Sequence, residues 1–300
     1  MIYRSGAHPL ASRVVIARRI LLRTGAASAL VFGLAPETAT AAPAERLRIS
    51  RNRLYVPARI AGRPVEALLD SAAESTLVDK AFAARAGIAG GAKATARGSG
   101  AAEVDSELVD GVSIAAFGVK INRGQVAIVD LSDVASRLTD GPLNVILGRD
   151  VFDQARLSVD ISHRSIRVLD RAILPRGLEF PLTPQFGIET MPVDVEGQSA
   201  RATVDLGNGT DVLVSPAFAG KLGALVDGRP LTRDTGGGIG GAASRTGFHI
   251  HTLRVANHVF HDVPATIDAG KNATDLNIGI SILRRFRLVL DFSEQKIWLD

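Results

Sequence analysis

The sequence predicts an all-β protein that is built from two tandem copies of one domain. Short segments rich in valine and isoleucine alternate between apolar and polar residues, a pattern typical of half-buried strands. Turn-forming residues separate these segments at intervals of roughly eight to twelve residues, which favours a barrel or sandwich over βαβ units. In addition, two blocks of sequence occur twice at nearly the same separation, which indicates a duplication.

The predicted strands come from both halves of the chain. They span residues 54–60, 65–69, 112–115, 125–129, 165–169, 249–255 and 296–299. Between them lie two alanine-rich segments, 80–87 and 216–223, which we expect to form short helices.

The first repeated block ends in an aspartate. Val56-Pro-Ala-Arg-Ile-Ala-Gly62 and Met191-Pro-Val-Asp-Val-Glu-Gly197 share a proline, an apolar alternation and a final glycine. Each is followed eight residues later by an aspartate, Asp70 or Asp205, so the two copies are 135 residues apart.

The second repeated block closes each half. Leu143-Asn-Val-Ile-Leu-Gly148 and Leu276-Asn-Ile-Gly279 are each followed twelve residues later by an aspartate, at a separation of 131 residues. A short helix is expected after each of these glycines. Proline and glycine interrupt the pattern at 174–181, so we predict one lobe over residues 42–175 and the second over 176–300.

Residues 1–41 have the composition of a signal peptide. They contain five arginines and one glutamate, followed by a modest apolar stretch and small residues. The segment Ala17-Arg-Arg-Ile-Leu-Leu-Arg23 resembles the twin-arginine export motif, with Ala17 where that motif has Ser or Thr. We therefore expect export to the periplasm or secretion.

Composition argues against several other functions. Outside residues 1–41, basic and acidic residues are equal in number, and the whole chain has two tyrosines and one tryptophan, which disfavours a nucleic-acid surface. No later segment has the ~18 consecutive apolar residues of a spanning helix, so no stable membrane span is expected. The absence of cysteine excludes disulfides and thiolate catalysis.

Two aspartates at equivalent points of a duplicated domain can meet on a pseudo-twofold axis. Two carboxylates a few ångströms apart cannot both ionise cheaply, so they share one proton. One can then act as a base toward water while the other, protonated, polarises a carbonyl. Such a pair hydrolyses peptide bonds without a metal or cofactor, and none is expected here.

The same residues resemble a known family. Leu69-Asp70-Ser71-Ala72-Ala73 resembles the Asp-Thr/Ser-Gly-Ala loop of retropepsin-like aspartic proteases, and Val145-Ile146-Leu147-Gly148 resembles their hydrophobic-hydrophobic-glycine motif. Val204-Asp205-Leu206-Gly207 and Asn277-Ile278-Gly279 repeat both motifs. The resemblance covers residues 47–300. In carrying both lobes in one chain, the protein is similar to bacterial exported members of the family.

This resemblance implies two tandem retropepsin-like β-barrel lobes in a monomer that is an intramolecular pseudo-dimer, acting on a peptide or protein substrate. It implies that Asp70 and Asp205 are catalytic and that the Ser71 hydroxyl braces the two aspartate loops. Gly207 keeps the glycine of the motif, whereas Gly148 and Gly279 are structural matches.

Two positions depart from the family pattern. Ala72 stands where the family has glycine, and a negative φ would be needed to tolerate its Cβ. Leu206 stands where the family has Thr or Ser, so one half of the hydroxyl brace is missing and the pKa of Asp205 should rise. The alternative to an exported aspartic endopeptidase is therefore a catalytically weak or inactive peptide-binding module of the same fold.

Two further patterns leave alternatives open. The glycine-dense stretches 97–100 and 235–244 occupy equivalent places in the two halves and are either flaps over the cleft or plain surface loops. His249, His251, His258 and His261 could form a zinc site of a hydrolase. The corresponding stretch of the first half has no histidine, and no His-Glu-x-x-His pattern accompanies the four, which favours a scaffold role.

Overall fold

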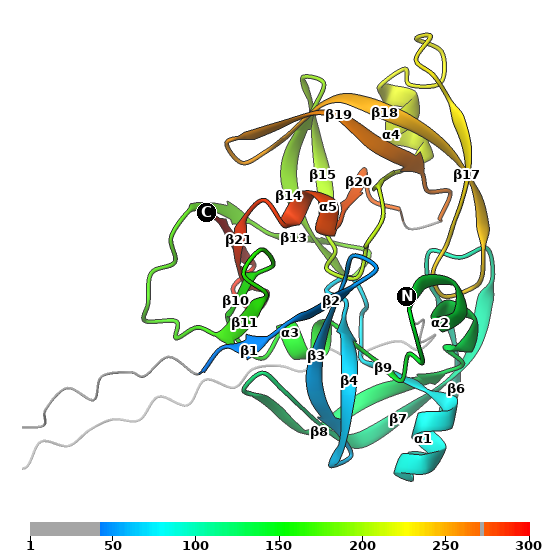
Figure 1. Cartoon of the computed structure of the whole chain (residues 1–300), viewed down its shortest axis with the longest axis vertical. Coiled ribbons are helices and arrows are strands. Elements are labelled where there is room, and N and C mark those ends of the chain that lie inside the picture. Colours follow the sequence, from blue (N-terminus) through cyan, green and yellow to red (C-terminus); the bar gives the residue numbers. More distant parts are fainter. Residues whose placement is uncertain (1–42, 271–272) are drawn as a thin grey trace, which may run out of the picture. The chain divides into compact units, whose positions relative to one another are not determined.

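The computed structural model of the protein describes residues 43–270 and 273–300 (Figure 1). Strands account for 51% and helices for 11% of the structure, which confirms the all-β prediction. The predicted signal peptide, residues 1–41, lies outside the described residues. The lobe boundary between residues 175 and 176 stays a prediction.

The first half forms an eight-stranded sheet with the strand order β2-β3-β4-β9-β5-β8-β7-β6. Its strands are β2 (Arg48–Ser50), β3 (Arg53–Ile60), β4 (Arg63–Leu69), β5 (Leu77–Asp79), β6 (Ala92–Arg97), β7 (Glu103–Ala116), β8 (Val119–Val129) and β9 (Val145–Leu147). The sheet closes on itself through an additional pairing of β3 with β7.

The second half repeats this sheet with the same topology, β13-β14-β15-β20-β16-β19-β18-β17, and the equivalent closing pair β14–β18. Its strands are β13 (Thr183–Gln185), β14 (Ile188–Val195), β15 (Gln198–Val204), β16 (Val212–Val214), β17 (Thr232–Gly236), β18 (Ala243–Val255), β19 (His258–Ile267) and β20 (Leu276–Ile278). The duplication read from two short blocks therefore extends to the whole lobe.

A third, six-stranded sheet joins the two halves, in the order β1-β11-β10-β21-β22-β12. The first half contributes β1 (Glu45–Arg46), β10 (Leu157–Asp160) and β11 (Ser165–Val168). The second contributes β12 (Leu178–Pro181), β21 (Arg287–Asp291) and β22 (Lys296–Leu299). At its centre, β10 and β21 run antiparallel, with Leu157 opposite Leu290.

The helices follow the strands at the predicted places. They are α1 (Lys80–Ala86), α3 (Arg149–Phe152), α4 (Pro216–Lys221) and α5 (Ile280–Leu283), with one further helix, α2 (Ser132–Leu138), that the sequence patterns did not indicate. Asp79 caps α1 by accepting hydrogen bonds from the backbone N–H groups of Ala81 and Phe82, which satisfies donors at the helix start. Ser215 caps α4 by accepting a hydrogen bond from the backbone N–H of Phe218.

Gly148 and Gly279 let two chain segments cross at very short range. A Cβ at Gly148 would lie 2.3 Å from the backbone oxygen of Ser75, and one at Gly279 would lie 2.1 Å from that of Asn208. Because a side chain at either point would collide with backbone, each glycine is required where the aspartate loop crosses the closing strand of its lobe.

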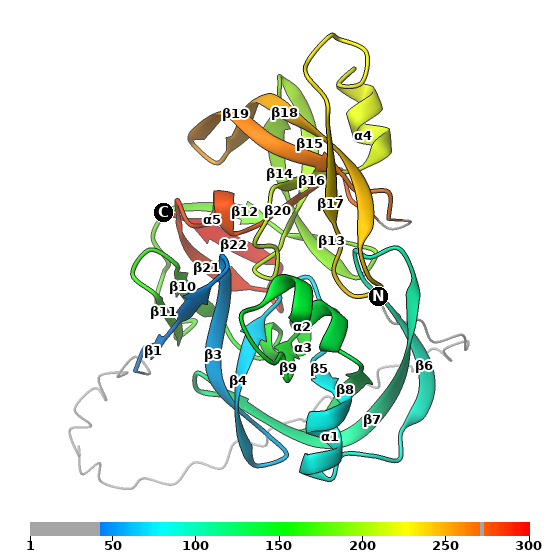
Figure 2. The same cartoon turned by 45° about the vertical axis from the view of Figure 1, so that its right-hand side comes forward.

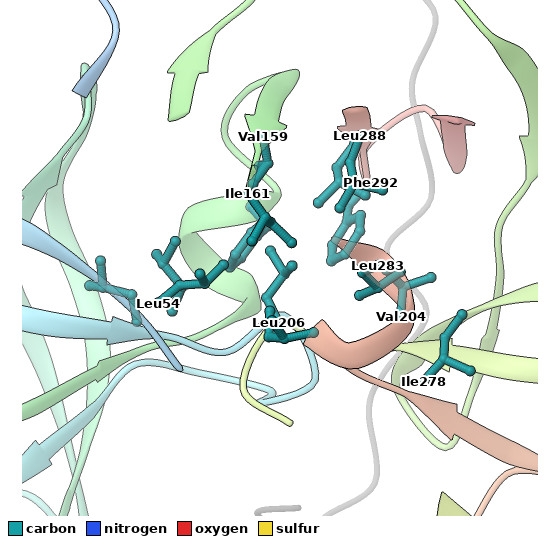
Figure 3. Close-up of a cluster of buried hydrophobic side chains, with 14 of the residues drawn as sticks. Leu54, Val159, Ile161, Val204, Leu206, Ile278, Leu283, Leu288 and Phe292 are labelled. Atoms are coloured by element: carbon teal, nitrogen blue, oxygen red, sulfur yellow. The ribbon is translucent and has the colours of Figure 1, made fainter. Parts of the chain in front are cut away.

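A continuous hydrophobic core contains residues of both halves. Figure 3 shows Leu206 among Leu54, Val159 and Ile161 of the first half and Leu283 and Phe292 of the second. Since this cluster is shared, the two aspartate loops are held against each other by buried apolar surface.

Candidate active site

Asp70 and Asp205 lie directly after equivalent strands, β4 and β15. Their backbone N–H groups donate to Leu147 and Ile278 respectively, each at 3.0 Å, so each loop is fixed to the closing strand of its lobe. The two carboxyl groups line the same pocket and lie close enough for each to influence the pKa of the other. Asp205 is 9% exposed and Asp70 is partly buried.

Each carboxylate is held by its own loop in the same way. Asp70 Oδ1 accepts from the backbone N–H groups of Ala72 and Ala73 at 2.9 and 3.0 Å. Asp205 Oδ1 accepts from those of Gly207 and Asn208 at 2.8 and 3.0 Å. The backbone of each loop therefore fixes the orientation of its own carboxylate.

Ala72 stands at the position of the family glycine but does not adopt a left-handed backbone conformation. It is not among the described non-glycine residues with positive φ. Its N–H still binds Asp70. At the equivalent point of the second loop, a Cβ on Gly207 would lie 2.5 Å from the Asp70 Cγ atom. The two positions are therefore not interchangeable, although the sequence repeat makes them equivalent.

Ser71 forms one half of the brace between the loops. Its buried hydroxyl donates to the backbone oxygen of Val204 at 2.7 Å and accepts from the N–H of Leu206 at 2.9 Å. The Leu206 side chain is fully buried in the shared core. Apolar packing thus takes the place of the second hydroxyl of the brace.

The environment of the pair raises both carboxyl pKa values. Burial, together with the negative charge of Asp205, raises the pKa of Asp70 to about 7, against the opposing effect of the Ala72 and Ala73 N–H groups. Burial also raises the pKa of Asp205, where hydrogen bonds from Asn277 and its own loop act in the opposite direction. The expected rise at Asp205 is present, and its main cause is burial of the whole pair.

The sequence patterns did not identify two residues of the site. Asn277, within the repeated block of the second half, donates through Nδ2 to Asp205 Oδ2 at 2.7 Å. Arg53 is 7% exposed at the start of β3 and interacts electrostatically with both aspartates. An arginine and an asparagine inside otherwise apolar strands were the available signals, because such residues are buried only where they have a partner.

The glycine-dense loops reach the same cavity. Gly98, Ser99 and Ile239 line a pocket together with Asp70 and Asp205. The two tips bind each other: the N–H groups of Gly100 and Ala102 donate to the backbone oxygens of Ile239 and Gly240, each at 2.9 Å. Figures 1 and 2 show the β6–β7 and β17–β18 hairpins approaching from opposite lobes, the arrangement of a pair of flaps.

The histidines of the second half do not meet in the described structure. His249 pairs with Asp262 at 2.7 Å, and His258 packs edge-on against Phe286. Within residues 43–270 and 273–300, no three potential metal-ligating side chains form a cluster that could hold an ion. In the same part of the chain, no helix has the length and apolar character needed to cross a membrane.

Comparison with known families agrees with this geometry. Residues 56–151 match an aspartyl protease family model, and residues 191–285 match the gag-polyprotein aspartyl protease model. No curated protein matches the chain. The chain thus carries two retropepsin-like aspartyl protease domains in tandem, one in each lobe.

Proposed function

We propose that the protein is an aspartic endopeptidase in which Asp70 and Asp205 activate a water molecule. The observation that carries the proposal is the pair of neighbouring, mutually interacting carboxyl groups at the junction of two aspartyl protease domains. One ionised carboxylate takes a proton from water as the water oxygen attacks the peptide carbonyl carbon. The protonated partner donates its proton to the carbonyl oxygen, giving a tetrahedral diol. When the carbon–nitrogen bond breaks, the first aspartate gives its proton to the leaving amine. A hydroxyl group of the diol returns a proton to the second aspartate, which leaves a carboxylic acid and restores the pair.

The two departures from the family pattern are compatible with this chemistry. Ala72 keeps the backbone hydrogen bond to Asp70, and the Ser71 hydroxyl alone connects both loops. The cavity at the carboxylates is covered by the paired loop tips, which would exclude bulk water once a peptide is bound.

Cleavage of an unfolded protein substrate by the purified chain tests the proposal. We expect activity at acidic to neutral pH, inhibition by pepstatin-type transition-state analogues, and loss of at least ~100-fold in kcat/KM for Asp70→Asn and for Asp205→Asn. Cleavage that survives both substitutions would refute the dyad. Peptide binding without turnover by the unaltered chain would instead favour a binding module.

We also propose that the chain is exported and acts as a monomer in the periplasm or outside the cell. Residues 1–41 support export through their arginines and small residues, and the six-stranded sheet between the lobes supports a pseudo-dimer within one chain. Fusion of residues 1–41 to a reporter enzyme, with Arg18 and Arg19 changed to lysine as the control, tests the export route. Light scattering of the purified protein tests the monomer.

A further inference from the structure

One polar side chain breaks the twofold symmetry of the aspartate pair. Asn277 in β20 lies opposite Thr203 and Leu213, and its topological equivalent in β9, Ile146, lies opposite Leu68 and Leu77. Asn277 donates to Asp205, whereas an isoleucine side chain has no donor to offer to Asp70.

The orientation of the Asn277 amide is fixed by a chain of hydrogen bonds. The backbone N–H of Thr210, which can only donate, binds Asn208 Oδ1 at 2.9 Å. Since Asn208 Oδ1 is the acceptor of this bond, the other amide atom is Nδ2, which donates to Asn277 Oδ1 at 2.9 Å. This leaves Asn277 Nδ2 to face Asp205 Oδ2, at 2.7 Å.

Asp205 consequently acts as an acceptor at both oxygens. Oδ1 accepts from the backbone of Gly207 and Asn208, and Oδ2 accepts from the Asn277 amide. At Asp70, the two backbone hydrogen bonds also go to Oδ1. Donors directed at a carboxylate favour its ionised form, and Asp205 receives one more of them than Asp70 from the described residues.

We propose that Asn277 is a positioning residue that holds Asp205 as the ionised member of the pair and thereby places the shared proton on Asp70. This assignment rests on the proposed proteolytic function and gives each aspartate one role. Asp205 is the base: it takes a proton from the water whose oxygen bonds to the carbonyl carbon. Asp70 is the acid: its proton passes to the carbonyl oxygen as the carbon–oxygen double bond becomes a single bond.

Other charged groups surround the pair and are unchanged in the variants below. Arg53 of β3 interacts electrostatically with both aspartates. Glu74, Arg97 and Asp268 line the pocket at the aspartates. Arg245 lines the adjoining pocket, 3.8 Å from Asp268. Any change in the pH profile between the unaltered chain and a variant at position 277 therefore reports on the amide itself.

The first test compares Asn277→Leu with the unaltered chain over a range of pH, with kcat/KM as the readout. The acid limb of the plot of kcat/KM against pH reports ionisation of Asp205. Loss of a hydrogen bond to a charged oxygen should move this limb upward by about one pH unit. The alkaline limb, which reports the proton of Asp70, should stay in place. A uniform decrease of kcat/KM at every pH, with neither limb moved, would overturn the proposal.

The mirror variant adds a control within the same fold. Ile146→Asn places an amide at the equivalent position beside Asp70, where it should lower the alkaline limb by about one pH unit. The combination of Ile146→Asn with Asn277→Leu should exchange the roles of the two aspartates. Movement of the acid limb by Ile146→Asn would contradict the assignment.

A second measurement separates this inference from the proteolytic function and needs no variant at position 277. In the full chain labelled with ¹³C-aspartate, the carboxyl signals of residues 70 and 205 are assigned from Asp70→Asn and Asp205→Asn. Asp205 should titrate at the lower pH of the two even if no substrate is cleaved, in which case only the function fails. Titration of Asp70 below Asp205 would overturn the proton placement.

Discussion

Arg156 and Asp291 form a buried ion pair across the junction of the two halves, with the guanidinium Nε donating to the carboxylate at 3.0 Å. The Asp291 side chain has no exposed surface and also accepts from Arg171 and Ser293. The repeat supplies a second copy of this pair, Arg287 with Asp160 at 3.1 Å. The central strands β10 and β21 are therefore joined twice by equivalent residues.

Breaking the Asp291 pair should destabilise the whole molecule. Burial acts to raise the pKa of Asp291, but hydrogen bonds from Arg171, Ser293 and Arg156 outweigh it and lower the pKa to about 2. We expect Asp291→Asn to reduce the free energy of unfolding by about 3 kcal/mol, because Arg156 is left buried without its counter-ion. Urea denaturation at pH 7 measures the change.

The control for Asp291 is an exposed ion pair. Glu66 pairs with Arg48 at 2.6 Å, and both side chains are about half exposed. Glu66→Gln should cost under about 1 kcal/mol. Equal losses of unfolding free energy for the two variants would contradict the larger contribution to stability that is assigned to the buried pair.

Gly207 and Ala72 should respond in opposite ways to exchange of alanine and glycine. Gly207→Ala would direct a Cβ to within 2.5 Å of the Asp70 Cγ atom, so the carboxyl group would have to move. We expect a loss of ~100-fold or more in kcat/KM, since small displacements of reacting groups have large effects on rate. The variant should still unfold cooperatively.

The matched change, Ala72→Gly, restores the family residue and removes only a methyl group. Its activity should stay within a few-fold of the unaltered chain, because the N–H donor to Asp70 is retained. A large gain in activity from Ala72→Gly would instead mean that the alanine impairs the site.

The sequence was sufficient for the repeat, the fold class and the placement of Asp70 and Asp205 in one pocket, because these depend on local patterns that occur twice. The departures from the repeat were harder to interpret. Asn277 and Ile146 occupy equivalent places, and only the folded structure reveals that the asparagine faces a carboxylate. Leu206 was noted as a lost hydroxyl, but its contribution to packing depends on side chains from both lobes that are distant in sequence.

Leu206 should therefore matter for stability. We expect Leu206→Ala to reduce the free energy of unfolding by about 3 kcal/mol, since it leaves a cavity in the core that the lobes share. Leu225, 47% exposed, provides the control, and Leu225→Ala should cost under about 0.5 kcal/mol. Comparable losses in urea denaturation would show that Leu206 packs less tightly than its burial indicates.

The contact between loop tips should govern access to the cavity. A Cβ at Gly100 would lie 2.3 Å from the carbonyl carbon of Gly240, so Gly100→Ala should force the tips apart. We expect kcat/KM to fall by about tenfold because the cavity closes less well over the substrate. Gly141, which has no atom within 4 Å of an added Cβ, is the control, and Gly141→Ala should leave the rate unchanged.

The raised pKa of Asp70 should make the aspartate pair a source of instability at high pH. Burial and the charge of Asp205 raise the pKa of Asp70 from 3.8 to about 7 in the folded protein, so between these values the folded chain retains a proton that the unfolded chain releases. The free energy of unfolding should therefore fall as the pH rises from about 4 to about 7. Asp70→Asn removes the titrating group and should be more stable than the unaltered chain at pH 8, with little difference at pH 4. Urea denaturation at both pH values measures this, and an equal difference at the two would mean that Asp70 is already ionised at low pH.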